Sequence, residues 1–294
     1  DYLEKAQRAS GKPVFLVANR QGSGADELAI SSTYREMPVL DGVTQFLVGA
    51  RCLLAYRDFQ RRPLMKCDVM DEKKVDYWKR QLQDCDDVSE SVASDLLSDF
   101  GIPMIQSLKV SSQDELQAAA LNVGFPLVLK TAVRGINHKT EVGGVILDIS
   151  DQYQLRDAYQ DLLQRLGPAV TVSPMADSSG VEMILGVSRD DQFGPTVVVG
   201  FGGIYAEILS DVAVLLPPFD AAKAKEALES LSMYPLLKGA RGALAMDVDS
   251  YCEAAAKMSA IALAFADRVV EIDINPIQLN AKCCIGLDAL VVLE

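Results

Sequence analysis

The segment that decides the fold is residues 124–149, which read GFPLVLKTAVRGINHKTEVGGVILDI. Its apolar stretches 127–131 and 145–149 have the composition of short buried strands. The polar stretch 132–144 between them ends in two glycines, which is typical of a loop. The segment therefore predicts two strands joined by a flexible polar loop.

Helices and strands alternate on both sides of this pair. A helix is predicted over 89–100, because Gly101 and Pro103 follow it as a stop signal. The further predicted helices cover 111–123, 152–166, 221–232 and 250–266, and the further strands cover 104–110, 169–175, 181–189, 196–200, 269–274 and 284–293. Hairpins mixed with helices indicate an α+β fold with two subdomains over residues 89–294.

The N-terminal part has a different pattern. Strands are predicted over 13–18 and 37–40, and helices over 25–36 and 41–56, an order that is typical of a parallel sheet. Two strands do not form a stable open sheet, so we expect residues 1–60 to be the C-terminal end of a larger α/β domain. The polar residues 61–88 are predicted to be a linker or connecting helix, which makes 89–294 the second domain.

The composition excludes several classes of protein. The 294 residues carry 28 Lys+Arg against 41 Asp+Glu, a formal charge of -13, and 49% of them are hydrophobic, which indicates a globular chain. An acidic surface repels nucleic acids and anionic membranes, so neither is an expected partner. No apolar run reaches the roughly 18 residues of a membrane helix. Six cysteines without CxxC spacing predict a reducing cytoplasm.

The loop of the central segment carries residues suited to phosphate chemistry. Lys130 ends an apolar strand, and His138, Lys139 and Gly143-Gly144 follow it in the loop. A lysine can face an anion while glycine amides approach it closely, and an exposed imidazole can act as a nucleophile toward a phosphoryl group. The alternative is a surface lysine, a structural histidine and an ordinary hairpin loop.

A second group of polar residues lies near the C-terminus. On a strand, Glu271, Asp273 and Asn275 alternate onto one face, and Asp288 follows on a neighbouring strand. Oxygen ligands in this arrangement suit Mg²⁺ beside a polyphosphate. The alternative is an edge strand whose acidic residues face water, and under either interpretation Pro276 is predicted to end the strand.

A glycine-rich turn at 200–203 reads GFGG and can offer the amides of Gly202 and Gly203 to an anion. It matches neither a Walker loop, because no G-K-[ST] follows, nor a dinucleotide fingerprint. Arg189 and Arg241 are further candidate phosphate or charge partners, with exposed arginine as the alternative for both.

Taken together, these stretches resemble the ATP-grasp portion of the nucleoside-diphosphate-forming acyl-CoA synthetases. The resemblance covers about 89–294 and rests on FGIP at 100–103, GFPLVLK at 124–130, HKTEVGGV at 138–145, DQFGP at 191–195, GFGGI at 200–204, GARG at 239–242 and EIDINP at 271–276. Residues 13–59, which end in YRDF, resemble the end of the flavodoxin-like second CoA-ligase subdomain of that family.

The resemblance implies an acid-thiol ligase in which an acid, CoA and ATP or GTP give acyl-CoA, the nucleoside diphosphate and phosphate, through an acyl phosphate and a phosphohistidine. His138 would be the phosphorylated histidine of a swinging loop, and Lys130 would hold nucleotide phosphates. Asn275 and Asp288 would bind Mg²⁺, which offsets phosphoryl charge.

The other site residues are implied in the same way. Glu182 and the backbone of Pro174 and Met175 would lie near the ribose and adenine. Lys139, Gly202 and Gly203 would complete the nucleotide site, and Arg241 would join His138 in catalysis.

The chain departs from the family in two respects. The family's other phosphorylated histidine and its CoA-binding module are absent, so the whole reaction cannot run on this chain unless another polypeptide supplies them. CoA and the carboxylic acid would bind through these missing CoA-ligase modules. After Arg241-Gly242 the sequence reads ALAMD, where the family often has a proline. The sequence leaves open whether the acid is aliphatic or aromatic like ferulate. It also leaves open whether the nucleotide is ATP or GTP and whether the protein forms a homo-oligomer. The alternative function is a nucleotide-sensing regulatory module of a protein acyltransferase.

Overall fold

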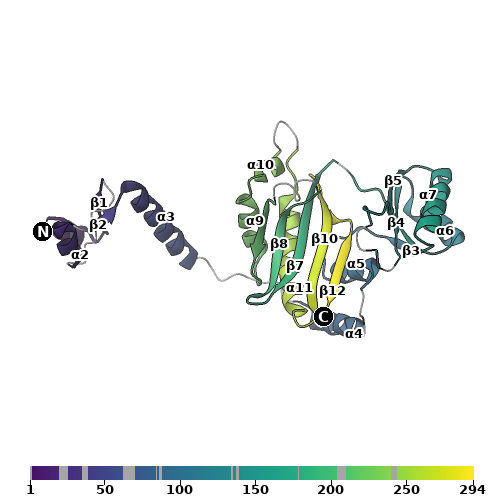
Figure 1. Cartoon of the computed structure of the whole chain (residues 1–294), viewed down its shortest axis with the longest axis horizontal. Coiled ribbons are helices and arrows are strands. Elements are labelled where there is room, and N and C mark those ends of the chain that lie inside the picture. Colours follow the sequence, from purple (N-terminus) through teal and green to yellow (C-terminus); the bar gives the residue numbers. More distant parts are fainter. Residues whose placement is uncertain are drawn as a thin grey trace. The chain divides into compact units, whose positions relative to one another are not determined.

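The computed structural model describes residues 2–19, 26–34, 39–61, 70–83, 85, 88–133, 135–136, 139–177, 179–203, 210–239 and 244–294. The chain divides into two compact units, residues 1–64 and residues 65–294. Figure 1 shows the elements of each unit. None of the helices in the described part of the chain is long and apolar enough to cross a membrane.

The first unit is a small α/β arrangement. Its elements are α1 (Tyr2–Ser10), β1 (Leu16–Ala18), α2 (Glu27–Tyr34), β2 (Val39–Asp41) and α3 (Val43–Gln60). Strands β1 and β2 pair in parallel, with Leu16 opposite Val39. This confirms the predicted strand-helix-strand-helix order and its parallel pairing. Helix α3 has no buried residue, so it adds little to a core.

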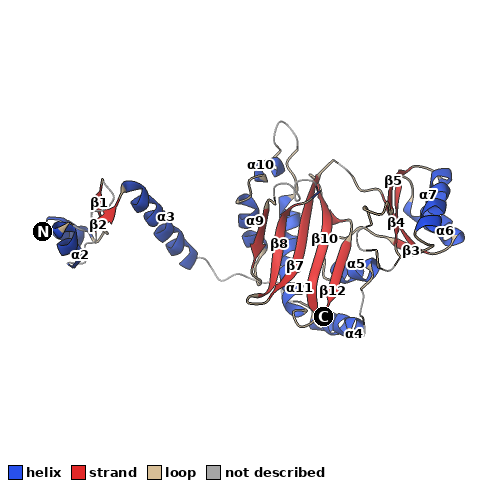
Figure 2. Cartoon of the chain, viewed as in Figure 1, coloured by secondary structure: helices blue, strands red, loops and turns tan. Residues whose placement is uncertain are grey.

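In the part of the second unit that the structure describes, the strands form two antiparallel sheets (Figure 2). The larger sheet has the order β11-β10-β7-β8-β9. In the same sheet, strand β12 also pairs with β10, along residues 269–274. Its strands are β7 (Val181–Asp190), β8 (Gly194–Phe201), β9 (Val212–Leu215), β10 (Val269–Leu279), β11 (Cys284–Gly286) and β12 (Ala289–Leu293). The smaller sheet has the order β3-β6-β4-β5, from β3 (Leu108–Val110), β4 (Leu127–Thr131), β5 (Val145–Ile149) and β6 (Val170–Pro174).

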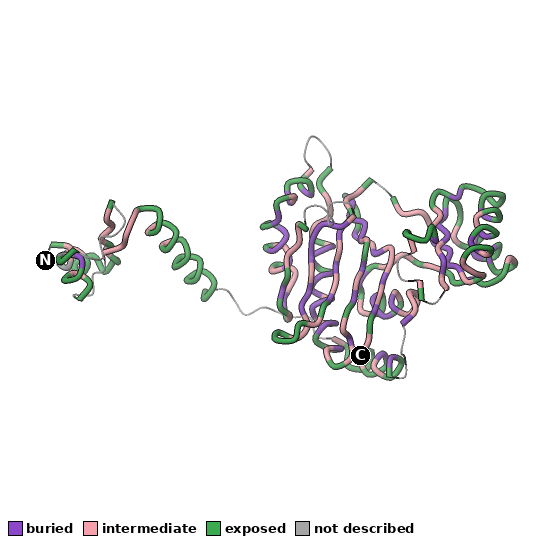
Figure 3. Tube along the Cα trace, viewed as in Figure 1, coloured by how far each residue is buried: buried purple, intermediate pink, exposed green. Residues whose placement is uncertain are grey.

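Helices cover both sheets and complete two separate cores. Those of the smaller sheet are α6 (Gln113–Val123) and α7 (Gln152–Arg165), and those of the larger are α4 (Glu72–Leu82), α5 (Glu90–Asp99), α9 (Ala221–Glu229), α10 (Tyr234–Leu237) and α11 (Val248–Ala264). Figure 3 shows buried residues along the strands and along α11. Two cores on two sheets confirm the predicted α+β fold with two subdomains.

Local sequence sets where these helices begin. The Ser112 hydroxyl accepts a hydrogen bond from the Glu115 amide at 3.3 Å, and the Glu115 carboxylate accepts one from the Ser111 amide at 2.8 Å, which caps α6. Asp151 caps α7 by accepting hydrogen bonds from the amides of Tyr153 and Gln154. The caps set where both helices begin, and their buried residues then pack in the core of the smaller sheet, whose hairpin carries Lys130.

The segment 61–88, predicted to be a linker or connecting helix, contains α4. Trp78 and Leu82 of this helix are buried in the core of the larger sheet, and the Trp78 indole donates a hydrogen bond to Asp99 at 2.9 Å. Helix α4 therefore packs as part of the second unit.

The prediction that Pro276 ends its strand is wrong. Strand β10 continues to Leu279, because the register against β7 shifts between Ile274 and Ile277 and pairing then resumes with Met183. Proline lacks an N–H, and the irregularity places it where the ladder is already interrupted. The stretch predicted as one strand over 284–293 divides into β11 and β12, with Leu287 and Asp288 between them.

Candidate nucleotide and metal site

The predicted hairpin is present, and its loop ends in an anchored turn. Strands β4 and β5 are antiparallel. The Gly144 amide donates a hydrogen bond to the Lys139 carbonyl at 2.7 Å, and the Thr131 amide donates one to the Gly144 carbonyl at 2.7 Å. Arg165 at the end of α7 donates hydrogen bonds to the carbonyls of Val142 and Gly143, at 3.0 and 2.9 Å. The turn 139–144 is thus tied to its own subdomain.

Gly144 is required by packing rather than by its backbone angles. A Cβ at this position would lie 2.6 Å from the Thr131 side chain and 3.0 Å from the Lys139 carbonyl oxygen. Gly143, beside it, has a φ of 61°, in the left-handed region that favours glycine. The two glycines therefore allow the turn to close against β4.

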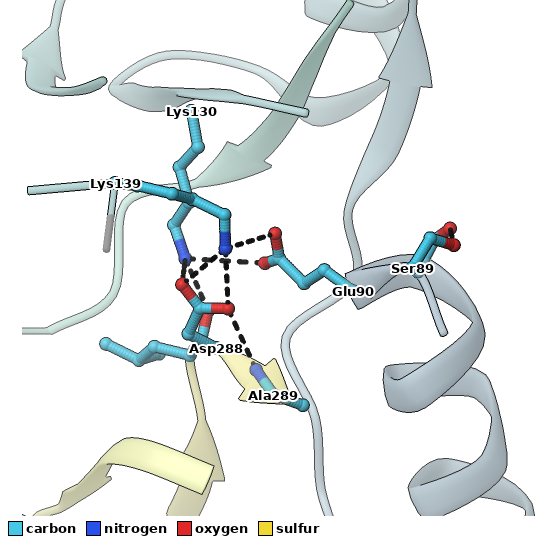
Figure 4. A network of polar contacts seen from close by, with 8 residues as sticks. Ser89, Glu90, Lys130, Lys139, Asp288 and Ala289 are labelled. Carbon is cyan, nitrogen blue, oxygen red and sulfur yellow. Dashed lines mark hydrogen bonds and ion pairs between the residues drawn. The ribbon is translucent and has the colours of Figure 1, made fainter. Parts of the chain in front are cut away.

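Within the ranges that the structure describes, four charged side chains meet between the two subdomains and form what we call the charge cluster: Glu90, Lys130, Lys139 and Asp288 (Figure 4). The Lys139 ammonium lies 2.9 Å from Glu90 Oε2 and 3.0 Å from each Asp288 oxygen. The Lys130 ammonium lies 3.7 Å from Glu90 Oε1 and 3.7 Å from Asp288 Oδ2, and it donates a hydrogen bond to the Leu287 carbonyl at 2.6 Å.

The two signs of charge come from different subdomains. The lysines belong to the β4–β5 hairpin of the smaller sheet. Glu90 is the first residue of α5, and Asp288 precedes β12, so both carboxylates belong to the larger sheet and its helices. The cluster therefore connects the subdomains through opposite charges.

The cluster is mostly withdrawn from water. The side chains of Glu90, Lys130 and Lys139 are each 12% exposed, and that of Asp288 is 26% exposed. Burial, followed by the charge of Asp288, raises the pKa of Glu90 although the lysines act against this. Burial alone would lower the pKa of Lys139, but the carboxylates of Asp288 and Glu90 outweigh it and raise the pKa. Lys139 is thus held as a cation.

The predicted metal ligands lie at one end of a strand pair. Ile274 of β10 is opposite Ala289 of β12, so Asn275 and Asp288 occupy the next position along the pair. Asp273 lies nearby, and burial and then the charge of Glu271 raise its pKa, while a hydrogen bond from the Asn275 side chain acts against them. The acidic side chains predicted to share a face of this strand therefore do so.

These residues fit a magnesium ion. Both Asp288 oxygens already converge on one cation, the Lys139 ammonium, and carboxylate and amide oxygens are the ligands that Mg²⁺ prefers. Among the described residues, no group of three or more His, Cys, Asp or Glu side chains forms a closed metal cage. An ion held by few protein oxygens completes its shell with water and substrate phosphates.

The residues predicted near the purine and ribose lie at the two ends of the segment that joins β6 of the smaller sheet to β7 of the larger one. The Met175 amide, just after β6 and Pro174, donates a hydrogen bond to the Pro126 carbonyl at 3.1 Å. The Gly202 amide donates one to the Glu182 carbonyl at 2.8 Å, so it is committed to the sheet in this conformation. Gly203 has a φ of 60°, and a Cβ there would collide with the Glu182 carboxylate. The Glu182 side chain therefore lies next to the glycine-rich turn.

Three further predictions have other outcomes. His138 and Arg241 lie outside the described residues. Arg189 forms an ion pair with Glu294 and donates a hydrogen bond to the Ala266 carbonyl at 2.7 Å, so it supports the C-terminus and not the charge cluster. Sequence reasoning missed Glu90, because an acidic residue in the first turn of a helix is usually explained by the helix dipole.

The ATP-grasp domain family model matches residues 83–293. Over 217 residues the chain is 35% identical to trans-feruloyl-CoA synthase FCS1 of an unidentified prokaryote, a region that is 70% of this chain and 30% of that protein. It is 33% identical to the beta subunit of the ADP-forming acetate–CoA ligase I of Pyrococcus furiosus, over 69% of this chain and 90% of the subunit.

Solved structures give the same relationship. An acetyl-coenzyme A synthetase 1 of Ca. Korarchaeum cryptofilum, in complex with coenzyme A and Mg-AMPPCP and with its phosphohistidine segment pointing towards the nucleotide binding site, matches with a TM-score of 0.66 and 28% identity. The match covers 76% of this chain and 100% of that one. The chain therefore belongs to the ATP-grasp family, and within it to the ADP-forming acyl-CoA synthetases.

Proposed function

We propose that the chain binds ATP with Mg²⁺ at the charge cluster and transfers its terminal phosphoryl group during acyl-CoA synthesis. The overall reaction would convert an acid, CoA and ATP into acyl-CoA, ADP and phosphate, through an acyl phosphate and a phosphohistidine. The observation that carries this proposal is the meeting of two lysines with Asp288, beside Asn275, between the subdomains of an ATP-grasp fold.

The chemistry follows from the charges in the cluster. Lys130 and Lys139 are partly buried cations that would face the phosphate oxygens, where low exposure strengthens the attraction. Asp288 and Asn275 would hold the Mg²⁺. When bound, Mg²⁺ would neutralise charge that develops on the transferred phosphoryl group.

The remaining roles are proposed on the family relationship. Glu182, Pro174 and Met175 would contact the ribose and adenine, beside Gly202 and Gly203. His138 would accept the phosphoryl group and Arg241 would assist it. The Korarchaeum structure, which holds Mg-AMPPCP and has a phosphohistidine segment pointing towards the nucleotide binding site, supports the role of His138.

The ATP-grasp region would need CoA-ligase modules to complete the reaction. The region aligned with trans-feruloyl-CoA synthase is 30% of that protein, whereas it is 90% of a Pyrococcus beta subunit. CoA and the acid would therefore bind through CoA-ligase modules, of which residues 1–60 would be the end, joined by 61–88 to the ATP-grasp domain at 89–294. We also propose a cytoplasmic setting, supported by the described cysteines, which are all free thiols.

The test is calorimetric titration of the chain with AMPPCP, a nonhydrolysable ATP analogue, in Mg²⁺ and in EDTA. Mg²⁺ should strengthen binding to the wild type, and Asp288→Ala or Asn275→Ala should remove most of that gain. Asp249→Asn is the matched control, because its carboxylate pairs with Lys225 at 2.8 Å on the surface. Absence of nucleotide binding by the wild type, or an equal gain in the Asp288 and Asn275 variants, would contradict the proposed site.

A further inference from the structure

Glu90 has no role in the chemistry proposed above. It begins α5, and its carboxylate extends into the charge cluster while the neighbouring Ser89 hydroxyl contacts Ser91 at 3.1 Å (Figure 4). Its oxygens lie 2.9 Å from the Lys139 ammonium and 3.7 Å from the Lys130 ammonium. The helix dipole alone does not explain these contacts, so the main interactions of the Glu90 carboxylate are with the two lysines.

Lys139 and a divalent cation would need the same atoms. The Lys139 ammonium lies 3.0 Å from both oxygens of Asp288. A cation bound by Asp288 requires one or both of these oxygens. A cation held through both Asp288 oxygens would take the position of the Lys139 ammonium, and one held through a single oxygen would compete with Lys139 for that atom.

Glu90 affects the free energy that is needed to move Lys139 away from Asp288. The cluster contains two ammonium groups and two carboxylates, so its formal charges balance. If Asp288 turns to a divalent cation, Lys139 still has Glu90 at 2.9 Å. Without Glu90, a mostly buried lysine would remain beside a new double positive charge with no further carboxylate partner among the described residues, which is strongly unfavourable.

We propose that Glu90 is a positioning residue that retains Lys139 at the site when a divalent cation takes Asp288. This role rests on the proposed function and concerns how the lysine and the metal share the cluster. Lys139 begins the anchored turn 139–144, whose Gly144 amide bonds to the Lys139 carbonyl. Glu90 thereby keeps the start of this turn, next in sequence to His138, close to the nucleotide phosphates.

The experiment is a double-mutant cycle on the affinity gain that Mg²⁺ gives to AMPPCP, the dissociation constant in EDTA divided by that in Mg²⁺. Glu90→Gln should reduce this gain about ten-fold, a typical effect of losing one charge-assisted contact. In the Lys139→Gln background, Glu90→Gln should change it less than about two-fold, because the two effects are coupled only through Lys139. An equal reduction in both backgrounds, or no reduction in either, overturns the positioning role.

The cycle separates this inference from the proposed function. Asp288→Asn and the wild type measure the site itself: if Mg²⁺ gives the wild type no gain, the proposed function fails and Glu90's role fails with it. If the gain is present and lost in Asp288→Asn, the site stands whatever the Glu90 variants do. Fluorescence of Trp78, the single and buried tryptophan, checks that each variant is folded.

Hydrogen exchange gives a second readout that does not depend on affinity. With saturating Mg²⁺ and AMPPCP, Glu90→Gln should exchange the amides of residues 139–144 at least about three-fold faster than the wild type, because Lys139 at the start of the turn loses its contact with Glu90 across the subdomains. The α6 peptide over 113–123 is the internal reference. Equal exchange of 139–144 in both proteins contradicts retention of Lys139 by Glu90.

Discussion

The Lys139 ammonium lies 3.0 Å from both carboxylate oxygens of Asp288, although the two residues are 149 positions apart in the chain. Lys139 comes from the hairpin loop of the smaller sheet, and Asp288 precedes the last strand of the larger one. The contact therefore joins the two subdomains at the proposed ligand site. Substitutions in either subdomain near this contact should change ligand binding.

Lys130→Met should weaken AMPPCP binding about ten-fold in both Mg²⁺ and EDTA, since a charge-assisted contact with phosphate is lost whether or not metal is present. Calorimetric titration measures this. Lys225→Met is the control, because Lys225 pairs with exposed Asp249. This variant should bind AMPPCP as tightly as the wild type does. An effect seen only in Mg²⁺ would mean that Lys130 acts on the metal and not on the phosphates.

Gly144→Ala should destabilise the second unit by about 1–3 kcal/mol, because its Cβ would meet the Thr131 side chain at 2.6 Å in a packed turn. Chemical denaturation followed by Trp78 fluorescence measures the free energy of unfolding. Gly49→Ala is the control: it lies in α3 with nothing within 4 Å of a Cβ, and alanine favours a helix there. Unchanged stability of Gly144→Ala would show that the turn adjusts freely.

Adjacent cysteines should react very differently. Cys283 is exposed, whereas Cys284 is buried, and burial raises the pKa of Cys284 to about 12. Iodoacetamide at pH 8 should alkylate Cys283 at least about 100-fold faster, because the thiolate is the reactive form and must be accessible. Peptide mass spectrometry over time measures both rates. Equal rates would mean that the β10–β11 turn opens readily.

Stability should fall in alkali. Burial raises the pKa of Cys252 to about 12, whereas an unfolded thiol has a pKa of about 8.5. The folded state holds this proton more tightly, so the contribution is complete below about pH 8.5 and declines as the pH rises toward 12. Between pH 8 and 10, the free energy of unfolding should fall by about 1–2 kcal/mol more in the wild type than in Cys252→Ala. Parallel pH profiles would contradict this.

The sequence predicts the fold more completely than the site. The β4–β5 hairpin follows from two apolar stretches around a polar, glycine-ended loop, which are local signals. Lys130 was identified because it ends one of these strands. Glu90 was missed, since nothing near it in sequence indicates that α5 begins opposite a hairpin about 40 residues later.

Pro276 shows the other limit of sequence reasoning. A proline ends a strand unless the pairing shifts around it, and the shift between Ile274 and Ile277 depends on β7, a partner distant in sequence. The break between β11 and β12 is similar, because it is set by two different stretches of β10. These long-range pairings place Asp288, and the local pattern does not contain them.

The smaller sheet has a consequence for how such a protein can be engineered. The segment that contains this sheet leaves the larger sheet after residues 103–105, where the Pro103 carbonyl and the Ile105 amide bond to Gly286 of β11. The segment returns at Gly180, which packs against Leu279 of β10. β11 and β10 are neighbours, so both ends of this insertion are fastened to one hairpin of the host. The insertion carries both lysines and the host carries both carboxylates. We therefore expect the lysine-bearing module to be exchangeable between relatives as a single cassette, with the acidic host unchanged.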